Sequence, residues 1–391
     1  MSNIRERVQK LFQDEFGREP SFVVRAPGRV NLLGEHVDYN DGFVLPAAID
    51  RAVWAACSPS TAPNSTLVAA DLSERISFSL DSIQTKTDLD GNPLPHWAKY
   101  PAGVLWILSK EGHNLPAIDG IFTSDVPRGS GLSSSAAVEM AFVHSFIKAG
   151  DVSPRPSSMD LAKIALRAER EYVGVNCGIM DQFASSCGVQ DHALYLDCRS
   201  LEWEPIPLPR DVSIVIADTS VPRSLSDSAY NERRSACETA VQLLDVESLR
   251  DVAVDLFHKN KTVLPQDVAK RAQHVVEEIQ RTEQSVHLLQ MGNVKAFGRL
   301  MNQCHESLRD LYEVSCPELD VMVEIAQSLP GCYGARLTGA GFGGCTVNLV
   351  ADDKVEDFSR ELAVQYKGRT DKEAKIYVCR ADEGAGIVKL T

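Results

Sequence analysis

Apolar and polar positions alternate along the chain with two different periods, which predicts short strands interspersed with helices. At the N-terminus, an otherwise polar segment carries one apolar stripe at helical spacing, formed by Ile4, Val8, Leu11, Phe12 and Phe16. Apolar or β-rich runs predict strands at residues 21–24, 49–57, 65–70, 76–80, 118–122, 192–197, 212–217 and 346–350. Helical spacing predicts helices at residues 96–108, 136–149, 160–172 and 230–243, and an almost wholly helical region at 246–331.

A loop rich in glycine and serine, residues 126–138, joins the strand predicted at 118–122 to the helix that follows it. The N–H groups at a helix start lack helical partners and the helix dipole is positive there, so a phosphate is well placed. Gly129 and Gly131 have no Cβ and let the backbone close around an anion. A plain turn with Ser135 as N-cap is the alternative, and phosphate binding is only modestly favoured. No lysine follows the glycines, so this is not the P-loop pattern.

Residues 25–46 are dense in charge and glycine, yet apolar strands flank them. Arg29, Glu35, His36 and Asp38 offer both signs of charge within ten residues. Sugar hydroxyls both donate and accept hydrogen bonds, so this mixture favours a small polar ligand. A loop that closes its own ion pairs is the second interpretation. A metal site is a distant third, because no second histidine stands at a ligand spacing.

Two acidic residues stand out further along the chain. Glu169 lies near the C-terminal end of the helix predicted at 160–172, where a carboxylate is unfavourable unless a cation offsets it. Magnesium would serve, although Arg170 and solvent are the simpler account. Asp181 is the one acid in a run of glycine and apolar residues, 174–183. From spacing alone, a positioned carboxylate and the N-cap of a helix are equally good interpretations of Asp181.

Four glycines fall within six residues at 339–344, just before the strand predicted at 346–350. They predict a tight backbone turn that can lie against another loop, since a plain hairpin turn needs fewer glycines. Trp97 and Tyr100 are predicted to be core aromatics of their helix. A wall for a nucleotide base is the minority interpretation.

The composition narrows the class of protein. The 391 residues, 44% of them apolar, suffice for two or three packed units, and prolines at 205, 207 and 209 suggest a domain junction. The formal charge of −14, without any basic run, argues against nucleic acid or an anionic membrane as partner. No stretch reaches membrane-spanning length, and no signal-peptide core is present. Ten scattered cysteines without a C-x-x-C pair predict reduced thiols in the cytosol, and therefore a cytoplasmic protein.

Three segments together resemble the three motifs of the GHMP kinases, the family of galacto-, homoserine, mevalonate and phosphomevalonate kinases. They are residues 25–46, 126–138 and 337–345, and within the first the run Gly-Glu-His-Val-Asp-Tyr-Asn-Asp-Gly is similar to the galactokinase signature. The resemblance continues through residues 177–182, 197–201 and 309–319. It implies an α+β fold with a ribosomal protein S5 domain 2-like N-terminal domain (1–204), a ferredoxin-like C-terminal domain (205–391) and an active site between them.

The resemblance also implies roles for individual residues. Asp181 would be the general base, and Arg29 the cation that orients it and stabilises the transferring phosphoryl group. Ser135 and Glu169 would hold Mg²⁺. The sugar would be bound by Glu35, His36, Val37, Asp38, Gly178 and Tyr230, and the ATP phosphates by Gly129, Ser130, Gly131, Leu132, Ser133, Ser134 and Ser135. Such a set suits phosphoryl transfer, in which positioning and charge neutralisation dominate.

The chain departs from the family pattern at Val37, Arg128 and Ala340, and at Ala229, where a glutamate is usual. The complete run at 133–137 favours an enzyme over a non-catalytic galactose and ATP sensor. We therefore expect an ATP- and Mg²⁺-dependent sugar kinase that makes α-D-galactose 1-phosphate. A kinase for N-acetylgalactosamine or arabinose is the nearest alternative. We expect small-molecule ligands, with no nucleic acid, membrane or obligate protein partner.

Overall fold

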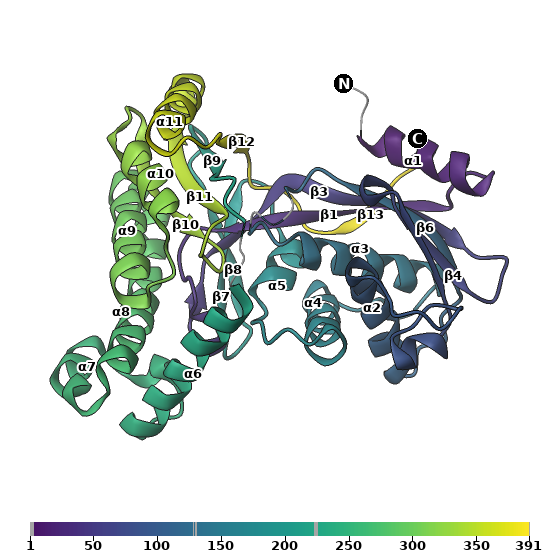
Figure 1. Ribbon diagram of the computed structural model, residues 1–391, viewed down its shortest axis with the longest axis horizontal. Coiled ribbons are helices and arrows are strands. Elements are labelled where there is room, and N and C mark those ends of the chain that lie inside the picture. The colour runs from purple at the N-terminus through teal and green to yellow at the C-terminus, as the bar shows by residue number, and fades with distance from the viewer. Residues whose placement is uncertain (1–3, 128, 130, 223–225, 391) are drawn as a thin grey trace.

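Two sheets, each covered by helices, divide the molecule into an N-terminal and a C-terminal half (Figure 1). The computed structural model describes residues 4–127, 129, 131–222 and 226–390. Predictions that involve Arg128 and Ser130 lie outside the described residues. Among the described residues, no helix combines the length and the apolar character that crossing a membrane requires.

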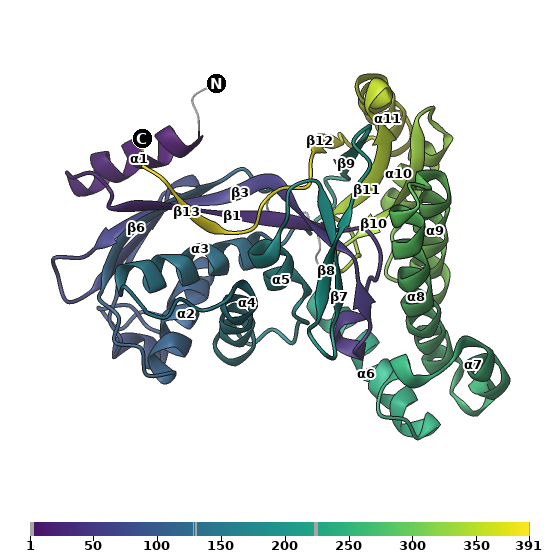
Figure 2. The ribbon, with the colours of Figure 1, turned by 180° about the vertical axis from the view of Figure 1, so that it is seen from behind.

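The N-terminal sheet has six strands in the order β13-β1-β3-β6-β4-β5, and only the pair β4–β6 is parallel. Its strands are β1 (Phe22–Asn31), β3 (Pro46–Pro59), β4 (Ser65–Ala69), β5 (Glu74–Phe78), β6 (Ile118–Ser124) and β13 (Gly386–Val388). Figure 2 shows β13, from the C-terminal end of the chain, lying beside β1. The C-terminal end of the chain thus completes the N-terminal half.

Helices cover both faces of this sheet. Helix α1 (Ile4–Phe16) packs on one face through the predicted apolar stripe, of which Val8 and Phe12 are fully buried. The other face carries α2 (Lys99–Lys110), α3 (Ser134–Ala149), α4 (Ser158–Arg167) and α5 (Met180–Cys187) (Figure 1). The N-terminus of the buried helix α3 points toward the C-terminal half (Figure 1).

The C-terminal sheet is antiparallel, with the order β10-β11-β9-β12. Its strands are β9 (Val212–Asp218), β10 (Cys332–Thr338), β11 (Cys345–Ala351) and β12 (Lys375–Cys379). The helices of this half of the molecule are α6 (Ser226–Leu244), α7 (Val254–Asn260), α8 (Gln266–Gln290), α9 (Val294–Ser307), α10 (Pro317–Ser328) and α11 (Val355–Thr370). Side chains of β9 alternate between two cores. Val215 and Ala217 pack with α10 and α11, whereas Ile214 and Ile216 enter a core that continues into the N-terminal half.

A small three-stranded sheet lies at the junction of the halves, in the order β2-β7-β8: β2 (Phe43–Val44), β7 (His192–Asp197) and β8 (Trp203–Pro207). The predicted division between residues 204 and 205 falls within β8, and the two-domain division stays a prediction. Pro205 and Pro207 are tolerated there because β8 is an edge strand of this sheet. One apolar core spans the junction, from Val30 of β1 to Ile279 of α8.

Two predicted boundaries were wrong in ways that matter for the site. The strand predicted at 21–24 continues to Asn31, because β3 pairs with it along that whole length, with a register shift between Pro27 and Arg29. The helix predicted at 160–172 ends at Arg167 and is followed by a π-helical turn, Ala168–Val173. Arg29 therefore projects from a strand, and Glu169 from a π-turn.

Candidate functional site

A polar pocket of about 410 Å³ opens where the two halves meet. It brings together most of the residues that the sequence singled out: Arg29, Glu35, His36, Asp38, Gly129, Gly131, Ser133, Ser134, Ser135, Glu169, Gly178, Asp181 and Tyr230. Tyr39, Asn231 and residues 174–177 also line it, and sequence reasoning did not assign them a role. Val37 and Leu132 do not line the pocket, because both side chains are buried in the core.

An ion pair between Arg29 and Asp181 lies in the wall of the pocket. Arg29 Nε and Nη2 lie 2.9 and 2.7 Å from Asp181 Oδ1, and Ser133 Oγ donates to Asp181 Oδ2 at 2.5 Å. Arg29 Nη1 donates to the Gly131 carbonyl at 2.5 Å. Ile179, not Asp181, occupies the N-cap position of α5. The N-cap alternative is therefore wrong, and the Asp181 carboxylate is held by these contacts and part-exposed to the pocket, while its role stays a prediction.

Next to this pair, the Gly–Ser loop (residues 126–133) leads into the N-terminus of α3. Gly129, Gly131 and Ser133 all have positive φ angles, 68°, 83° and 55°. Ser133 occupies the N-cap position without a side-chain capping bond, so the assignment of Ser135 as N-cap was wrong. The buried residue Leu132 anchors the loop, since its carbonyl accepts from the Arg29 N–H at 3.1 Å. Ser133, Ser134 and Ser135 line the pocket, and the N–H groups in the first turn of a helix have no partner within the helix, a suitable environment for an anion.

Buried carboxyl groups lie behind the loop. Gln182 Nε2 donates to Glu169 Oε2 at 2.5 Å and to Glu139 Oε2 at 3.0 Å. Burial, followed by the charge of Asp181, raises the pKa of Glu169, and burial, followed by the charge of Glu169, raises the pKa of Glu139 well above its usual value. Among the described residues, Arg170 is not paired with either carboxyl group, because its guanidinium donates to the Cys177 carbonyl. The raised pKa values favour the protonated acids, and a cation bound beside Glu169 would favour its carboxylate instead.

The donor set suits magnesium. Glu169 accepts a hydrogen bond from Ser135, so a carboxylate and a hydroxyl lie together at the edge of the anion site. Mg²⁺ prefers oxygen ligands and usually takes one or two carboxylates plus phosphate oxygens. Among the described residues, no group of three or more histidine, cysteine, aspartate or glutamate side chains forms a metal cage. The residues present therefore fit an ion that is shared with a bound phosphate.

The opposite wall of the pocket is the 34–38 loop. Gly34 and His36 have positive φ angles of 87° and 62°. His36 Nδ1 lies 2.9 Å from the Tyr39 hydroxyl, and its ring lies 5.7 Å from that of Tyr230. Burial lowers the pKa of His36 to about 4, so this ring is neutral. Burial, together with the nearby charges of Asp181 and Glu35, raises the pKa of Asp38 to about 7. This wall offers acceptors and aromatic faces to a small polar ligand.

A second cavity of about 870 Å³ adjoins the first, and the two share Gly129, Ser134 and Ser135. Its walls include Trp97 and Tyr100, which the sequence assigned to the core. Trp97 does pack on the core edge, with its ring 5.6 Å from Phe122, but both aromatics are only part-buried and face the cavity. Trp97 therefore packs on the core as predicted, and both aromatics also line the cavity, while their role as a wall for a base stays a prediction.

The glycine-rich turn joins β10 to β11, so it is a hairpin that also lies against other loops. Phe342 N–H donates to the Val314 carbonyl at 2.7 Å, and Gly339 N–H donates to Glu35 Oε2 at 3.0 Å. A Cβ on Gly341 would lie 2.2 Å from the Val314 carbonyl oxygen. Backbone proximity explains the glycine, and it places Gly339 and Ala340 at the pocket wall.

Protein-family models match three parts of the chain. The "GHMP kinases N terminal domain" matches residues 99–189, the "GHMP kinases C terminal" model matches 285–368, and the "Galactokinase galactose-binding signature" matches 10–59. The N-terminal match includes the whole Gly–Ser loop and α3, and the C-terminal match includes the glycine-rich turn. The chain therefore belongs to the GHMP kinases.

Individual relatives narrow this class. A galactokinase of Roseiflexus sp. (strain RS-1) is 47% identical over 388 residues, which are 97% of this chain and 96% of the relative. The crystal structure of Lactococcus lactis galactokinase complexed with galactose is 32% identical, with a TM-score of 0.92, covering 98% of this chain and all of that one. Streptococcus pneumoniae phosphomevalonate kinase, at 14% identity and a TM-score of 0.64 over 94% of this chain and 99% of its own, shares the fold. Within the GHMP kinases, the chain belongs with the galactokinases.

Proposed function

We propose that this chain phosphorylates D-galactose at the C1 hydroxyl with ATP and releases α-D-galactose 1-phosphate and ADP. The observation that carries the proposal is the Asp181 carboxylate, held by Arg29 and Ser133 between the polar pocket and the N-terminus of α3. The galactose-binding signature over residues 10–59 and the galactokinase relatives support galactose as the sugar. The ten free cysteines support a reducing compartment such as the cytosol.

In this proposal, the sugar lies between the 34–38 loop and Asp181. Glu35, His36, Asp38, Gly178 and Tyr230 hold its hydroxyls, and the aromatic cavity at Trp97 takes the adenine. Asp181 accepts the proton of the C1 hydroxyl as the oxygen attacks the γ-phosphorus, since a carboxylate beside an arginine stays a competent acceptor. Arg29 keeps that carboxylate oriented and offsets charge on the transferring phosphoryl group.

The N-terminus of α3 and the serine hydroxyls hold the remaining phosphate oxygens. Ser135 and Glu169 would hold Mg²⁺, which supplies charge neutralisation to the β- and γ-phosphates when it is bound.

The direct test is ADP release by the purified full chain with a panel of acceptors. The panel contains galactose, N-acetylgalactosamine, arabinose, mevalonate and homoserine. Galactose should give the highest kcat/KM. Strong turnover on a non-sugar acceptor, or none on galactose, would contradict the proposal, and ATP and galactose binding without turnover would identify a sensor.

Replacing Gly178 with alanine should raise KM for galactose by roughly 10–100-fold, on the scale of the 1–3 kcal/mol that overpacking costs. A Cβ at this position would lie 1.9 Å from Asp38 Oδ2 and 2.4 Å from its Cγ. Asp38 must therefore move out of the sugar site. Gly368→Ala is the matched control, because no atom lies within 4 Å of its Cβ position. An unchanged KM in steady-state assays of Gly178→Ala would remove Asp38 from the sugar contacts.

Replacing Asp38 with asparagine should stabilise the free protein at high pH. The pKa of Asp38 is raised by burial to about 7, so between pH 4 and 7 the folded state keeps a proton that the unfolded chain has lost. The contribution of Asp38 to stability is therefore complete below pH 4 and is lost as the pH rises through 7. The lowered pKa of His36 adds its own pH dependence to stability, but equally in both proteins, so it cancels in the difference between them.

The measurement is the thermal midpoint of both proteins at pH 5.5, 7.0 and 8.5. The midpoint of Asp38→Asn relative to wild type should rise by roughly 4 °C or more between the first and last pH, because the wild type loses about 2 kcal/mol between pH 5.5 and its pKa of about 7. A difference that does not change with pH would contradict the raised pKa of Asp38.

A further inference from the structure

The 34–38 loop is held from behind by charged side chains that do not line the pocket. We propose that Arg336 of β10 is a specificity-determining residue, which fixes the oxygen of Glu35 that faces the sugar, while Glu278 and His274 of α8 hold the backbone of the same loop. This inference rests on the proposed function, since it assigns to Glu35 a sugar hydroxyl as its partner.

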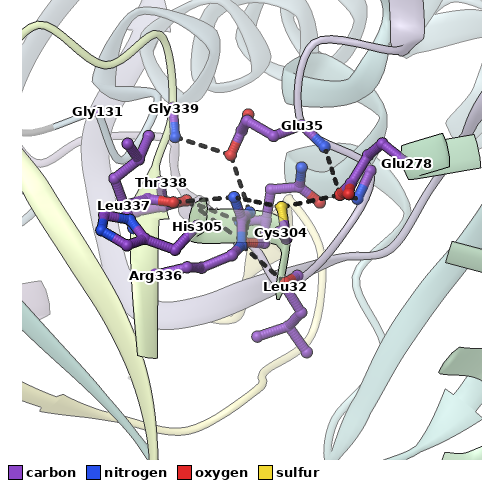
Figure 3. Close-up of polar contacts among 12 residues, drawn as sticks. Leu32, Glu35, Gly131, Glu278, Cys304, His305, Arg336, Leu337, Thr338 and Gly339 are labelled. Carbon is purple, nitrogen blue, oxygen red and sulfur yellow. Dashed lines mark hydrogen bonds and ion pairs between the residues drawn. The ribbon is translucent and has the colours of Figure 1, made fainter. Parts of the chain in front are cut away.

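The Arg336 side chain is completely buried, and its hydrogen bonds together fix the plane of the guanidinium (Figure 3). Its Nε donates to the Leu32 carbonyl at 2.8 Å, and its Nη1 donates to the Leu337 carbonyl at 2.8 Å. Its Nη2 donates to the Asn31 carbonyl and, at 2.8 Å, to Glu35 Oε2. The guanidinium thus connects β10 to the end of β1 and to the loop, and a lysine ammonium cannot reproduce this planar set.

Glu35 has two oxygens with different tasks. Its Oε2 accepts from Arg336 and also from the Gly339 N–H at 3.0 Å. In Figure 3 its other oxygen points away from Arg336 and joins none of the residues drawn, and Glu35 lines the polar pocket. Oε1 is therefore the oxygen left for a ligand. A carboxylate accepts hydrogen bonds but donates none, so its partner must be a hydroxyl that donates.

The backbone of the loop is fixed by α8. Glu278, which is fully buried, accepts from the Gly34 N–H at 2.8 Å through Oε1 and pairs with Arg281 through Oε2. Burial alone would raise the pKa of Glu278, but the charge of Arg281 and the hydrogen bond from Cys304 hold it below its usual value.

One helical turn earlier, His274 Nε2 lies 3.0 Å from the Glu35 carbonyl, and its Nδ1 lies 2.8 Å from Ser307 Oγ. Burial lowers the pKa of His274 to about 3, so its neutral ring donates from Nε2 while Nδ1 accepts from the serine. Residues four apart on a helix share a face, so one stretch of α8 holds both an N–H and a carbonyl of the loop. The positive φ angles at Gly34 and His36 persist because these contacts over-determine the backbone.

These contacts predict how selectivity should change. Arg336 fixes the plane of the Glu35 carboxylate, so Glu35 presents one acceptor oxygen at one place. One sugar hydroxyl should therefore determine the contribution of Glu35 to the choice between sugars. When the guanidinium is replaced, Oε2 loses one of its two donors and the carboxylate can rotate. Binding of that hydroxyl should weaken while the contacts of the other hydroxyls, made by Asp38 and Tyr230, remain.

The test measures kcat/KM for galactose and for its 2-, 3-, 4- and 6-deoxy analogues in wild type, Glu35→Gln and Arg336→Lys. Wild type should lose at least tenfold with the one analogue that lacks the Glu35 partner. In Arg336→Lys this penalty should fall below about threefold, while the other penalties stay within twofold of wild type. Arg25→Lys is the matched control, because Arg25 also bridges a carboxylate, Asp382, and two backbone carbonyls, away from the pocket. An equal loss on every sugar, or an unchanged pattern, would overturn the inference.

A second measurement keeps Arg336 intact, in case its replacement prevents folding. In Glu35→Gln, Arg336 and the Gly339 N–H should hold the amide oxygen, so the amide NH₂ faces the sugar. A deoxyfluoro analogue at the identified carbon accepts but cannot donate, so it should outperform the deoxy analogue several-fold in Glu35→Gln and not in wild type. The same ratio in both proteins would overturn the inference. Absence of wild-type turnover on galactose would instead contradict the proposed function, so the two failures are distinguishable.

Discussion

Replacing Asp181 with asparagine should lower kcat for galactose phosphorylation by about 10²–10⁴-fold, the range that a positioned general base contributes. Asparagine keeps the shape of the side chain, and its oxygen can still accept from Arg29 while its NH₂ group faces Ser133 Oγ. The contacts that hold α5 against the Gly–Ser loop are therefore kept, and only the ability to accept a proton is lost. KM for galactose should change by less than about tenfold, because we propose that other side chains bind the sugar.

The measurements are kcat and KM for the variant, with galactose binding by calorimetry. Asp382→Asn is the control, since Asp382 also pairs with an arginine, Arg25, but lies outside the pocket. A variant that binds galactose normally and keeps wild-type turnover would show that Arg29 and the phosphate contacts suffice for catalysis. Loss of galactose binding in the variant would show that Asp181 acts mainly as a sugar ligand and not as a base.

The sequence was most informative where a motif is local. Gly129 to Ser135 lie next to one another in the chain, and glycine in front of a helix N-terminus has a direct physical meaning. Arg29 and Asp181 were brought together only by the family resemblance, because they are 152 residues apart and no periodicity connects them. Arg29 directly follows the register shift in the pairing of β1 with β3, which one strand of the sequence cannot reveal on its own.

The supporting side chains were missed because they look like surface residues. Glu278 lies on the buried face of α8 together with Val275 and Thr282, and an acid on such a stripe is the one signal that could have marked it. Arg336 lies inside a short apolar strand and contacts Glu35 across 301 residues. Buried charges are costly unless they are paired, so each of them requires its partner, but the sequence does not name that partner.

The cavity lined by Trp97 and Tyr100 shows a different limit of the sequence. Trp97 and Tyr100 have the apolar character of core residues, and helical spacing places them on the inward side of α2 and the turn before it. They stop short of full burial because the Gly–Ser loop and the segment around Val221 form the far wall of a cavity. Whether an aromatic residue completes a core or lines a cavity depends on its neighbours in space, which the chain order does not supply.

Replacing Arg29 with methionine should lower kcat by about 10³–10⁵-fold, the scale that an arginine on a transferring phosphoryl group contributes. Arg29→Lys should fall between this variant and wild type, because an ammonium keeps the charge but not the fork. Arg29 bonds Asp181 through two nitrogens and the Gly131 carbonyl through the third, and its side chain is only 5% exposed. It therefore connects the proposed proton acceptor directly to the loop that we propose to hold the phosphates.

This connection makes a prediction that charge alone does not. If Arg29 only supplied charge, the lysine variant would keep most of the activity, and KM for ATP would be unchanged. Since the fork also fixes Gly131, both variants should raise KM for ATP as well as lower kcat. Arg25→Lys is the control, because it removes an arginine of the same strand without touching the pocket. A lysine variant within threefold of wild type in kcat would show that the charge of residue 29, and not its geometry, sustains phosphoryl transfer.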